Sequence, residues 1–424
     1  MIDRSLNGRI HHRDTKNTKE STKLNNLRSI GLTSLWLSLC SWCLCGESPA
    51  QDTPRFERIV IDDDFPGGYQ VEVADVNGDG KPDIIALGGG TCAWYENPTW
   101  TKRIITTPDQ TPGIISSAAA DLDGDGKAEI AIAHDFAMRE PKRGKLALAI
   151  QGETPDDPWT LKHIADVPSI HRVRWGDITG DGRLDLVVAP IFGPEAEAPT
   201  YEDPARLVFF STGDDPKSGQ WADPIELARR PVMHAIRVDG PAVLSADNLG
   251  VGLNWHNGIQ GTSGTLHPGA PGEAPDRGAS EIHRGRNAGN LRGGFTATIE
   301  PWHGNQVVVY QRAADASPDG AERQALSISR TVLDDTLDDG HALWVADIDG
   351  DGNDEVFAGH RGEDYRVSMY KFDGETWQRT VLDTEIAAQD LRGGDLDGNG
   401  VPDVVAIGGK THNVVWYRPI REGE

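Results

Sequence analysis

The chain has 424 residues, a formal net charge of −25 and 49 glycines, and only 7% of its residues are aromatic. This excess of negative charge disfavours nucleic acid as a partner, because phosphates attract basic proteins. Only one of the four cysteines, Cys92, follows residue 50, so the main part of the chain has no disulfide framework.

The first 50 residues predict an export signal. Residues 1–28 are polar and basic, residues 29–46 are uncharged and rich in Leu, Trp and Cys, and Ser48-Pro49-Ala50 offers a small-residue cleavage site. We therefore expect a secreted or periplasmic protein with no transmembrane domain in its mature form. A signal anchor is the alternative, because the apolar run just reaches spanning length. A lipoprotein signal is disfavoured, since no small residue precedes Cys40, Cys43 or Cys45.

The rest of the chain, 51–424, contains five copies of an acidic motif, D-x-[DNT]-G-[DN]-G-x-x-[DE]. The copies span 75–83, 121–129, 177–185, 347–355 and 395–403. Oxygen atoms at positions one, three, five and nine, with the carbonyl of position seven, can converge on one hard cation, and glycines at positions four and six permit the turn. The motif lacks Cys and His, so Ca²⁺ is the expected ion. A D/G-rich hairpin turn that binds nothing is the alternative.

The motif predicts up to five structural Ca²⁺ sites. The expected ligands, including the position-seven carbonyls, are Asp75, Asn77, Asp79, Lys81, Asp83, Asp121, Asp123, Asp125, Lys127, Glu129, Asp177, Thr179, Asp181, Arg183, Asp185, Asp347, Asp349, Asp351, Asn353, Glu355, Asp395, Asp397, Asn399, Val401 and Asp403. The spacing is not that of an EF-hand, because position twelve is apolar and the flanks are typical of short buried strands.

The spacing of the copies predicts the fold class, an all-β seven-bladed propeller. Successive copies start 46, 56, 170 and 48 residues apart, and the long gap holds two degenerate units that turn near 239 and 300. Seven mostly β units of roughly 50 residues indicate radial repetition. A strand at 56–61 would pair with one at 413–417 and close the ring, which hides both sheet edges. We interpret 51–424 as one domain.

These loops and flanks resemble the FG-GAP/VCBS repeat family. The resemblance covers 56–418 and implies a calcium-loaded propeller, in a family that includes both adhesion modules and enzymes. The stretches HALWVADIDGDG and IEPWHG are also similar to the propeller portion of the aldos-2-ulose dehydratases.

Strand direction predicts where a functional site lies. The acidic loops join the first strand of a unit to the second, on what we call the bottom face. The opposite end, the top face, then carries His171, His234 and His341 at the start of first strands. Second-to-third connections add His134, Asp135, Asp247, Asn248, His360, Arg361 and His412, and neighbouring loops carry Arg229, Arg230, Arg284, Arg286 and Arg292. This register places His303 on the bottom face.

Two classes of function follow from this ring of His and Arg. In a carbohydrate-active lyase or dehydratase, one of His171, His234 and His341 would act as base, and Arg172, Arg361 or Arg292 would stabilise an enolate. The alternative is a non-catalytic binding or scaffold module for a glycan, a small sugar or a protein, in which the histidines cap strands. A transition-metal site among the histidines is a further possibility, and a hydrolase with paired carboxylates has weaker support.

Overall fold

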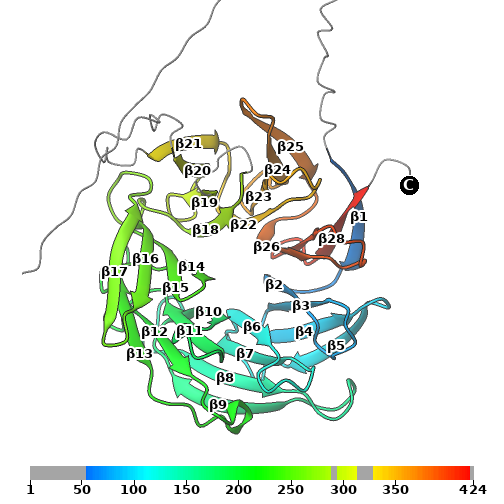
Figure 1. Cartoon of the computed structure of the whole chain (residues 1–424), viewed down its shortest axis with the longest axis vertical. Coiled ribbons are helices and arrows are strands. Elements are labelled where there is room, and N and C mark those ends of the chain that lie inside the picture. Colours follow the sequence, from blue (N-terminus) through cyan, green and yellow to red (C-terminus); the bar gives the residue numbers. More distant parts are fainter. Residues whose placement is uncertain (1–53, 288–293, 313–327, 421–424) are drawn as a thin grey trace, which may run out of the picture. The chain divides into compact units, whose positions relative to one another are not determined.

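The computed structural model describes residues 54–287, 294–312 and 328–420. Within these ranges the chain forms seven four-stranded antiparallel sheets, the blades of a β-propeller. The inner strands β2, β6, β10, β14, β18, β22 and β26 surround the centre, and each contacts the inner strands of its neighbours (Figure 1). The predicted fold class is therefore confirmed.

Each blade takes consecutive strands, except the last. Blade 1 has β2 (Gly68–Ala74), β3 (Asp83–Gly88), β4 (Thr91–Glu96) and β5 (Thr101–Thr106); blade 2 has β6 (Ser116–Ala120), β7 (Glu129–His134), β8 (Lys145–Ile150) and β9 (Thr160–Asp166); blade 3 has β10 (Ile170–Gly176), β11 (Asp185–Pro190), β12 (Ala205–Ser211) and β13 (Ile225–Arg230). Blade 4 has β14 (Ala235–Asp239), β15 (Ala242–Asp247), β16 (Gly250–His256) and β17 (Gly261–His267); blade 5 has β18 (Glu281–Gly285), β19 (Phe295–Glu300), β20 (Gln306–Arg312) and β21 (Ile328–Asp334); blade 6 has β22 (Gly340–Ala346), β23 (Glu355–His360), β24 (Val367–Phe372) and β25 (Trp377–Asp383).

Blade 7 joins the two ends of the folded chain. It contains β26 (Ala388–Gly394), β27 (Asp403–Gly408) and β28 (Val414–Ile420), and β1 (Arg55–Asp62) completes it by antiparallel pairing with β28. Ile59 lies opposite Trp416 in this pair. The expected closure by the terminal strands is correct, and it supplies blade 7 with its outer strand.

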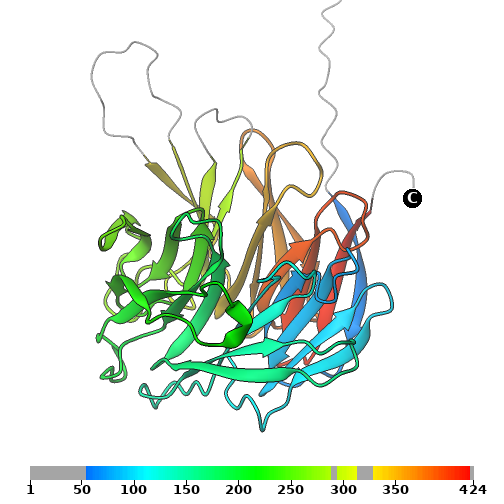
Figure 2. The same ribbon diagram turned by 60° about the horizontal axis from the view of Figure 1, so that its bottom comes forward.

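The core lies between the blades. Central strands such as β3 and β11 are buried along their whole length, whereas outer strands such as β25 alternate between exposed and covered residues. Apolar side chains of adjacent blades interdigitate, as where Trp344 and Phe357 of blade 6 pack with Leu391 and Val404 of blade 7. The oblique view shows the blades packed face to face around the axis (Figure 2). The blades therefore hold the inner strands, and the groups on them, in fixed positions.

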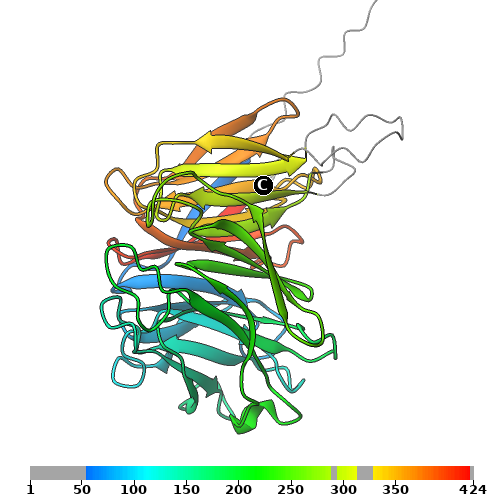
Figure 3. The same ribbon diagram turned by 90° about the vertical axis from the view of Figure 1, so that its left-hand side faces the viewer.

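The connections gather at the two ends of the blades (Figure 3). All five acidic loops join an inner strand to the next strand, on the bottom face as predicted. In blade 4 a tight turn at Gly240, with φ +57°, replaces the acidic loop. The first two loops touch, since a Cβ added at Gly78 would lie 2.6 Å from the carbonyl oxygen of Gly126. Only glycine fits there.

Blade 5 differs from the prediction by one strand. The segment near 294–300 was expected to be an inner strand, but it forms β19, the second strand of its blade, and β18 is the inner strand. The error arose because the Gly-Phe-Thr-Ala-Thr-Ile-Glu segment is as apolar as an inner strand. The connection that contains His303 consequently lies on the top face, which corrects its expected position.

The described residues include one short 3₁₀ helix, η1 (Pro216–Ser218), and no helix there is long and apolar enough to cross a membrane. Segment 1–50 lies outside the described residues, so the export signal stays a prediction.

Candidate functional site

Four inner strands have a β-bulge near their top ends. The ladders of β2, β10, β22 and β26 each skip one residue near the top end. The skipped residues are Tyr69, His171, His341 and Gln389. A β-bulge re-aims the side chain of the extra residue. Four separate blades thus place a polar side chain at the same level.

Four imidazole rings meet at this level, and we call them the histidine cluster: His171, His234, His303 and His341. The ring centroid of His234 lies 4.8 Å from that of His171, 4.7 Å from that of His303 and 5.0 Å from that of His341. Tyr69 lies beside the cluster, with its ring 5.3 Å from His341. Three of the four histidines were predicted to share a register, and the structure brings those three together.

Hydrogen bonds to the backbone fix the tautomer of three of these histidines. Nδ1 of His171 lies 3.1 Å from the carbonyl oxygen of His234, Nδ1 of His234 lies 3.0 Å from that of Ser280, and Nδ1 of His341 lies 2.6 Å from that of Gln389. A carbonyl only accepts, so Nδ1 must carry the proton. The lone pair of each ring is then on Nε2, the nitrogen free to bind a proton or a metal.

His303 completes a set of three metal-binding nitrogens. Its Nε2 is 3.0 Å from Nε2 of His234, and His234, His303 and His341 each offer a ring nitrogen within 4.8 Å of the others. On its other side, Nδ1 of His303 lies 3.3 Å from an Arg361 nitrogen and 3.5 Å from Oδ1 of Asp339. Either tautomer of His303 thus has a partner. Three imidazoles are a donor set that suits Zn²⁺ and related ions.

Burial keeps the cluster neutral. It holds the pKa of His171, His234, His303 and His341 well below the ordinary 6.5, and the nearby guanidinium groups of Arg172 and Arg361 act in the same direction. Neutral imidazoles keep their lone pairs at physiological pH. The side chain of His303 is 28% exposed, so solvent reaches the cluster from its side.

Charged groups surround the cluster in pairs. The Arg172 guanidinium lies over the Tyr69 ring, 5.3 Å from its centroid, and 3.8 Å from Glu281. Burial raises the pKa of Glu281 to about 6, partly offset by Arg172. Arg361 donates to Asp339 at 2.8 Å and to the Gln389 side chain at 2.6 Å. Both arginines were predicted site residues, and both are in the site.

Other predicted top-face residues have structural roles. Arg230 donates to Asp247 at 2.7 and 3.1 Å, and both side chains are buried. His360 lies beside the backbone of Asp338. Arg284 and Arg286 were expected on the top face, but they follow the corrected inner strand β18 to the bottom, where Arg286 binds Asp354 at 2.8 Å. Arg292 lies outside the described residues.

Sequence reasoning missed Tyr69 as a reacting group, and it missed Glu281 and Asp339 altogether. Tyr69 lies near the start of a first strand, at the register of the histidines, but the sequence alone does not mark it as a reacting group. Its hydroxyl lies 3.1 Å from Nε2 of His171 and 3.5 Å from Nε2 of His341. A bulge leaves no distinctive sequence pattern, so the approach of these side chains could not be predicted.

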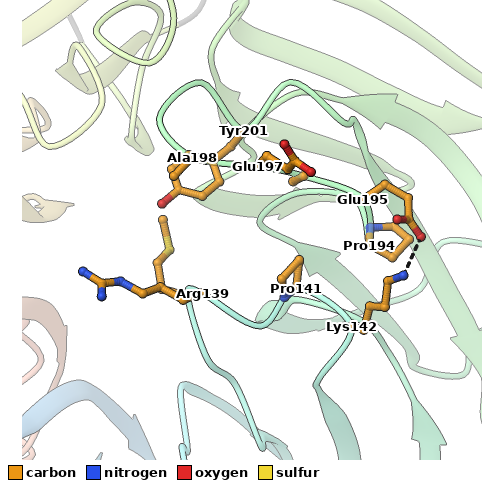
Figure 4. A pocket seen from close by; sticks show the side chains of 10 residues that line it. Arg139, Pro141, Lys142, Pro194, Glu195, Glu197, Ala198 and Tyr201 are labelled. Carbon is orange, nitrogen blue, oxygen red and sulfur yellow. Dashed lines mark ion pairs between the residues drawn. The ribbon is translucent and has the colours of Figure 1, made fainter.

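Aromatic side chains pack against the cluster on one side and form a wall there. Phe136 lies 5.6 Å from His171 and Trp302 lies 5.0 Å from His303, measured between ring centroids. Beyond this wall is a rim pocket of 380 Å³ between the two long connections of blades 2 and 3. Tyr201 and Arg139 lie on its inner side, and Lys142 pairs with Glu195 at 2.9 Å on its outer side (Figure 4).

The acidic loops of the bottom face have a common geometry. In the first copy both oxygens of Asp75 accept backbone N–H groups, from Gly78 and Gly80 at 2.8 Å. Ligand oxygens lie within 4.8 Å of one another in three copies: Asp121, Asp123 and Glu129; Asp347, Asp349 and Asp351; Asp395, Asp397 and Asp403. In the last copy Oδ1 of Asp395 is buried and accepts no hydrogen bond from the described residues. The donor set and this orphaned oxygen fit Ca²⁺.

Three of the carboxylates at position nine have clearly raised pKa values. Burial raises the pKa of Glu355 to about 8, that of Asp83 to about 7 and that of Asp403 to about 6. Neighbouring loop carboxylates add to each shift. These groups are therefore unfavourably charged at neutral pH unless a cation lies beside them.

Comparisons with known proteins identify both the repeats and the propeller. An FG-GAP-like repeat model matches residues 75–132 and 347–406, and the model of the aldos-2-ulose dehydratase β-propeller domain matches residues 147–313. Aldos-2-ulose dehydratase of Phanerodontia chrysosporium is 27% identical over 356 residues, which are 75% of this chain and 39% of the relative. The chain thus spans well under half the length of that relative.

Two solved structures align with most of this chain. A lectin of Agrocybe aegerita, whose structure concerns recognition of non-reducing terminal N-acetylglucosamine, has a TM-score of 0.46 and 14% identity over 84% of this chain and 86% of its own. An extracellular domain described with a one-component system of B. thetaiotaomicron has a TM-score of 0.47 and 10% identity over 85% of this chain and 39% of its own. From the sequence matches we conclude that the chain is a β-propeller with FG-GAP-like repeats that is related to the propeller domain of aldos-2-ulose dehydratase.

Proposed function

We propose that the protein is a carbohydrate-active lyase or dehydratase whose reaction centre is the histidine cluster. The relation to aldos-2-ulose dehydratase indicates a carbohydrate-active role at the level of the family. One observation carries the finer proposal. Four imidazoles, a phenol and two guanidinium groups lie close together at the top of the propeller. The bulged ends of separate inner strands and the β19–β20 connection place them there.

Elimination of water from a keto-sugar or a uronate has two chemical needs. A base removes the proton from the carbon next to the carbonyl or carboxylate, and a hydroxyl leaves from the adjoining carbon as the double bond forms. Negative charge that develops on the carbonyl oxygen needs a fixed positive partner. The cluster offers both kinds of group.

We assign the proton transfer to Tyr69 and His171. The Tyr69 hydroxyl donates to Nε2 of His171, so the phenol can pass its proton to the imidazole and take the substrate proton on its oxygen. The guanidinium of Arg172, with a nitrogen 3.5 Å from the hydroxyl oxygen, stabilises negative charge there. His171 thus acts through Tyr69, which refines the expectation that a histidine is the base. The proton that His171 accepts can then pass to the leaving hydroxyl, so that water departs and both side chains return to their starting state.

We assign a metal-binding role to the other three histidines. Nε2 of His234, His303 and His341 would hold a divalent transition-metal ion, and such an ion polarises a carbonyl oxygen when bound. Arg361 lies at the exposed side of the same group and can bind a hydroxyl or carboxylate of the sugar. Its bonds to Asp339 and Gln389 orient it.

The test is turnover together with metal content. The purified protein is incubated with keto-sugars and uronate polysaccharides, and a new ultraviolet absorbance of an unsaturated product is recorded. Tyr69→Phe should abolish turnover and keep the metal, whereas His341→Ala should lose both. His412→Asn is the matched control, because His412 is an exposed top-face histidine outside the cluster. Full activity of Tyr69→Phe would rule out the assigned proton transfer.

A sugar-binding module without catalysis is the second candidate. The rim pocket favours it, because Tyr201 and Trp302 present aromatic rings, 6.2 Å apart between centroids, next to an open pocket. Aromatic rings commonly stack against sugars. Calorimetric binding of an oligosaccharide that Tyr201→Ala abolishes, with no turnover of any sugar tested, would support this candidate over the enzyme.

We further propose that Ca²⁺ fills acidic loops of the bottom face and that the protein is exported. The buried, raised-pKa carboxylates at position nine support the first proposal. Extracellular Ca²⁺ concentrations are high enough to fill weak sites, so the two proposals are consistent. N-terminal sequencing of the protein recovered outside the cells tests export.

A further inference from the structure

The acidic loop at 121–129 contains a cation supplied by the protein itself. The ammonium nitrogen of Lys217 lies 2.7 Å from Asp123, 2.7 Å from Asp125 and 3.0 Å from Glu129. These are positions three, five and nine of the loop, three of the four side-chain ligands expected for Ca²⁺. A divalent ion bound to the same oxygens would need the space that the ammonium takes.

Lys217 reaches this loop from the neighbouring blade. It belongs to η1, in the bottom-face connection between β12 and β13 of blade 3. Two contacts hold η1 in place: Lys162 of blade 2 donates to the Lys217 carbonyl at 2.5 Å, and Trp221 donates to the Pro216 carbonyl at 2.9 Å. These two contacts fix η1, and η1 in turn positions the Lys217 ammonium at the loop.

The other acidic loops are different. Lys81 and Arg183 each contact one carboxylate of their own loop and are about half exposed, at 52% and 51%. Lys371, from β24, contacts Asp349 and lies 3.5 Å from Asp351, but no ion pair joins it to Glu355. In the described residues, Lys217 alone reaches the position-nine carboxylate of an acidic loop. Within its own loop Glu129 is the most buried of the three carboxylates that Lys217 contacts, with 1% of its side chain exposed against 35% for Asp123 and 45% for Asp125.

We propose that the Lys217 ammonium is the resident cation of the second acidic loop, so that this loop is stabilised without Ca²⁺. The inference deepens the proposed calcium role, on which it rests for the chemistry of the loop. Calcium can enter only if Lys217 moves away, and a pocket of 290 Å³ beside Asp125 and Lys127 gives an ion access to the same oxygens. The second loop is then the weakest calcium site of the five.

The experiment compares Ca²⁺ stoichiometry in the full-length protein and in Lys217→Met, by calorimetry after removal of metal. Methionine keeps the unbranched chain and removes the charge. The variant should bind one more Ca²⁺ than the wild type in the micromolar to millimolar range, or bind one ion at least about tenfold more tightly, which is ~1.4 kcal/mol. Adding Asp121→Asn to Lys217→Met should remove the gain, which assigns it to this loop.

Two controls keep the outcomes distinct. Lys410→Met removes an exposed lysine of the top face, far from the acidic loops, and should leave the stoichiometry unchanged. Lys217→Gln replaces the methionine variant if that variant does not fold. Equal stoichiometry and affinity in wild type and Lys217 variants would overturn the inference. A wild type that binds no Ca²⁺, with a variant that binds one, would support it while contradicting calcium binding by the other loops.

Discussion

The two ends of the inner strands differ in how they hold their functional groups. At the bottom end, each acidic loop gathers its oxygens within nine consecutive residues, so one blade makes a whole site. At the top end, no blade contributes more than part of the cluster, and the groups of blades 1, 3, 4, 5 and 6 meet only when the ring closes. The local loops are suited to holding a structural cation, and the assembled cluster is suited to chemistry. Four changes test this division.

The largest expected effect is the loss of turnover when a histidine of the top-face cluster is replaced. His303→Ala and His341→Ala should each lower turnover by about 10³-fold or more, ~4 kcal/mol, because a metal set of three nitrogens loses a member. The melting temperature should change little, since no blade loses its core. Metal content by mass spectrometry and the visible spectrum after Co²⁺ loading provide readouts independent of activity. Unchanged metal content would contradict the assigned ligands.

The buried ion pair Arg230–Asp247, on the top face but outside the cluster, should affect stability and not turnover. Asp247→Asn leaves the buried Arg230 without its charge partner, so we expect a loss of about 3–5 kcal/mol in the free energy of unfolding. Urea denaturation measures it. Asp135→Asn, which breaks the more exposed pair with Arg143, is the control and should leave the curve unchanged. Equal losses in the free energy of unfolding for Asp247→Asn and Asp135→Asn would contradict the idea that burial of the ion pair determines the cost of breaking it.

Removal of Ca²⁺ should affect stability and not the chemistry of the top face. A ligand present at 100 times its dissociation constant stabilises the native state by about 2.7 kcal/mol per site. Treatment with the chelator EGTA should therefore lower the melting temperature by several degrees, and added Ca²⁺ should restore it. The control is the same protein freed of chelator and reloaded with Zn²⁺ alone, whose turnover should persist below the new transition. An unchanged melting curve would contradict the calcium proposal.

The smallest effect concerns pH. Without metal, the pKa of Glu355 is about 8 and that of Asp83 about 7, both raised above their ordinary values. The native state then binds more protons than the unfolded chain, so the contribution of these groups is present at low pH and is lost as pH rises through 7 and 8. Metal-free protein should melt at a lower temperature at pH 8.5 than at pH 6. Saturating Ca²⁺ should remove this trend, because the ion favours the charged carboxylates.

Part of the site could be predicted because it depends on strand direction alone. The acidic loops mark the bottom end of five inner strands, so His171 and His341 had to lie at the other end, and the degenerate turn near 239 placed His234 in the same way. His303 was misplaced because β19 has the apolar pattern of an inner strand, and the acidic loop that would have identified the true inner strand, β18, is missing from blade 5. Lys217 at the second loop could not be predicted either, since it comes from the next blade.

The sequence by itself determined the number of blades, the closure by β1 and β28 and the position of every acidic loop. These features follow from short-range patterns, a nine-residue motif and the periodicity of apolar strands. Only the tertiary structure decided which side chains form the cluster and which cation lies in the second loop. Both depend on bulges and on contacts between blades, where residues such as Tyr69 and His341 are 272 positions apart and the chain between them carries no signal of their approach.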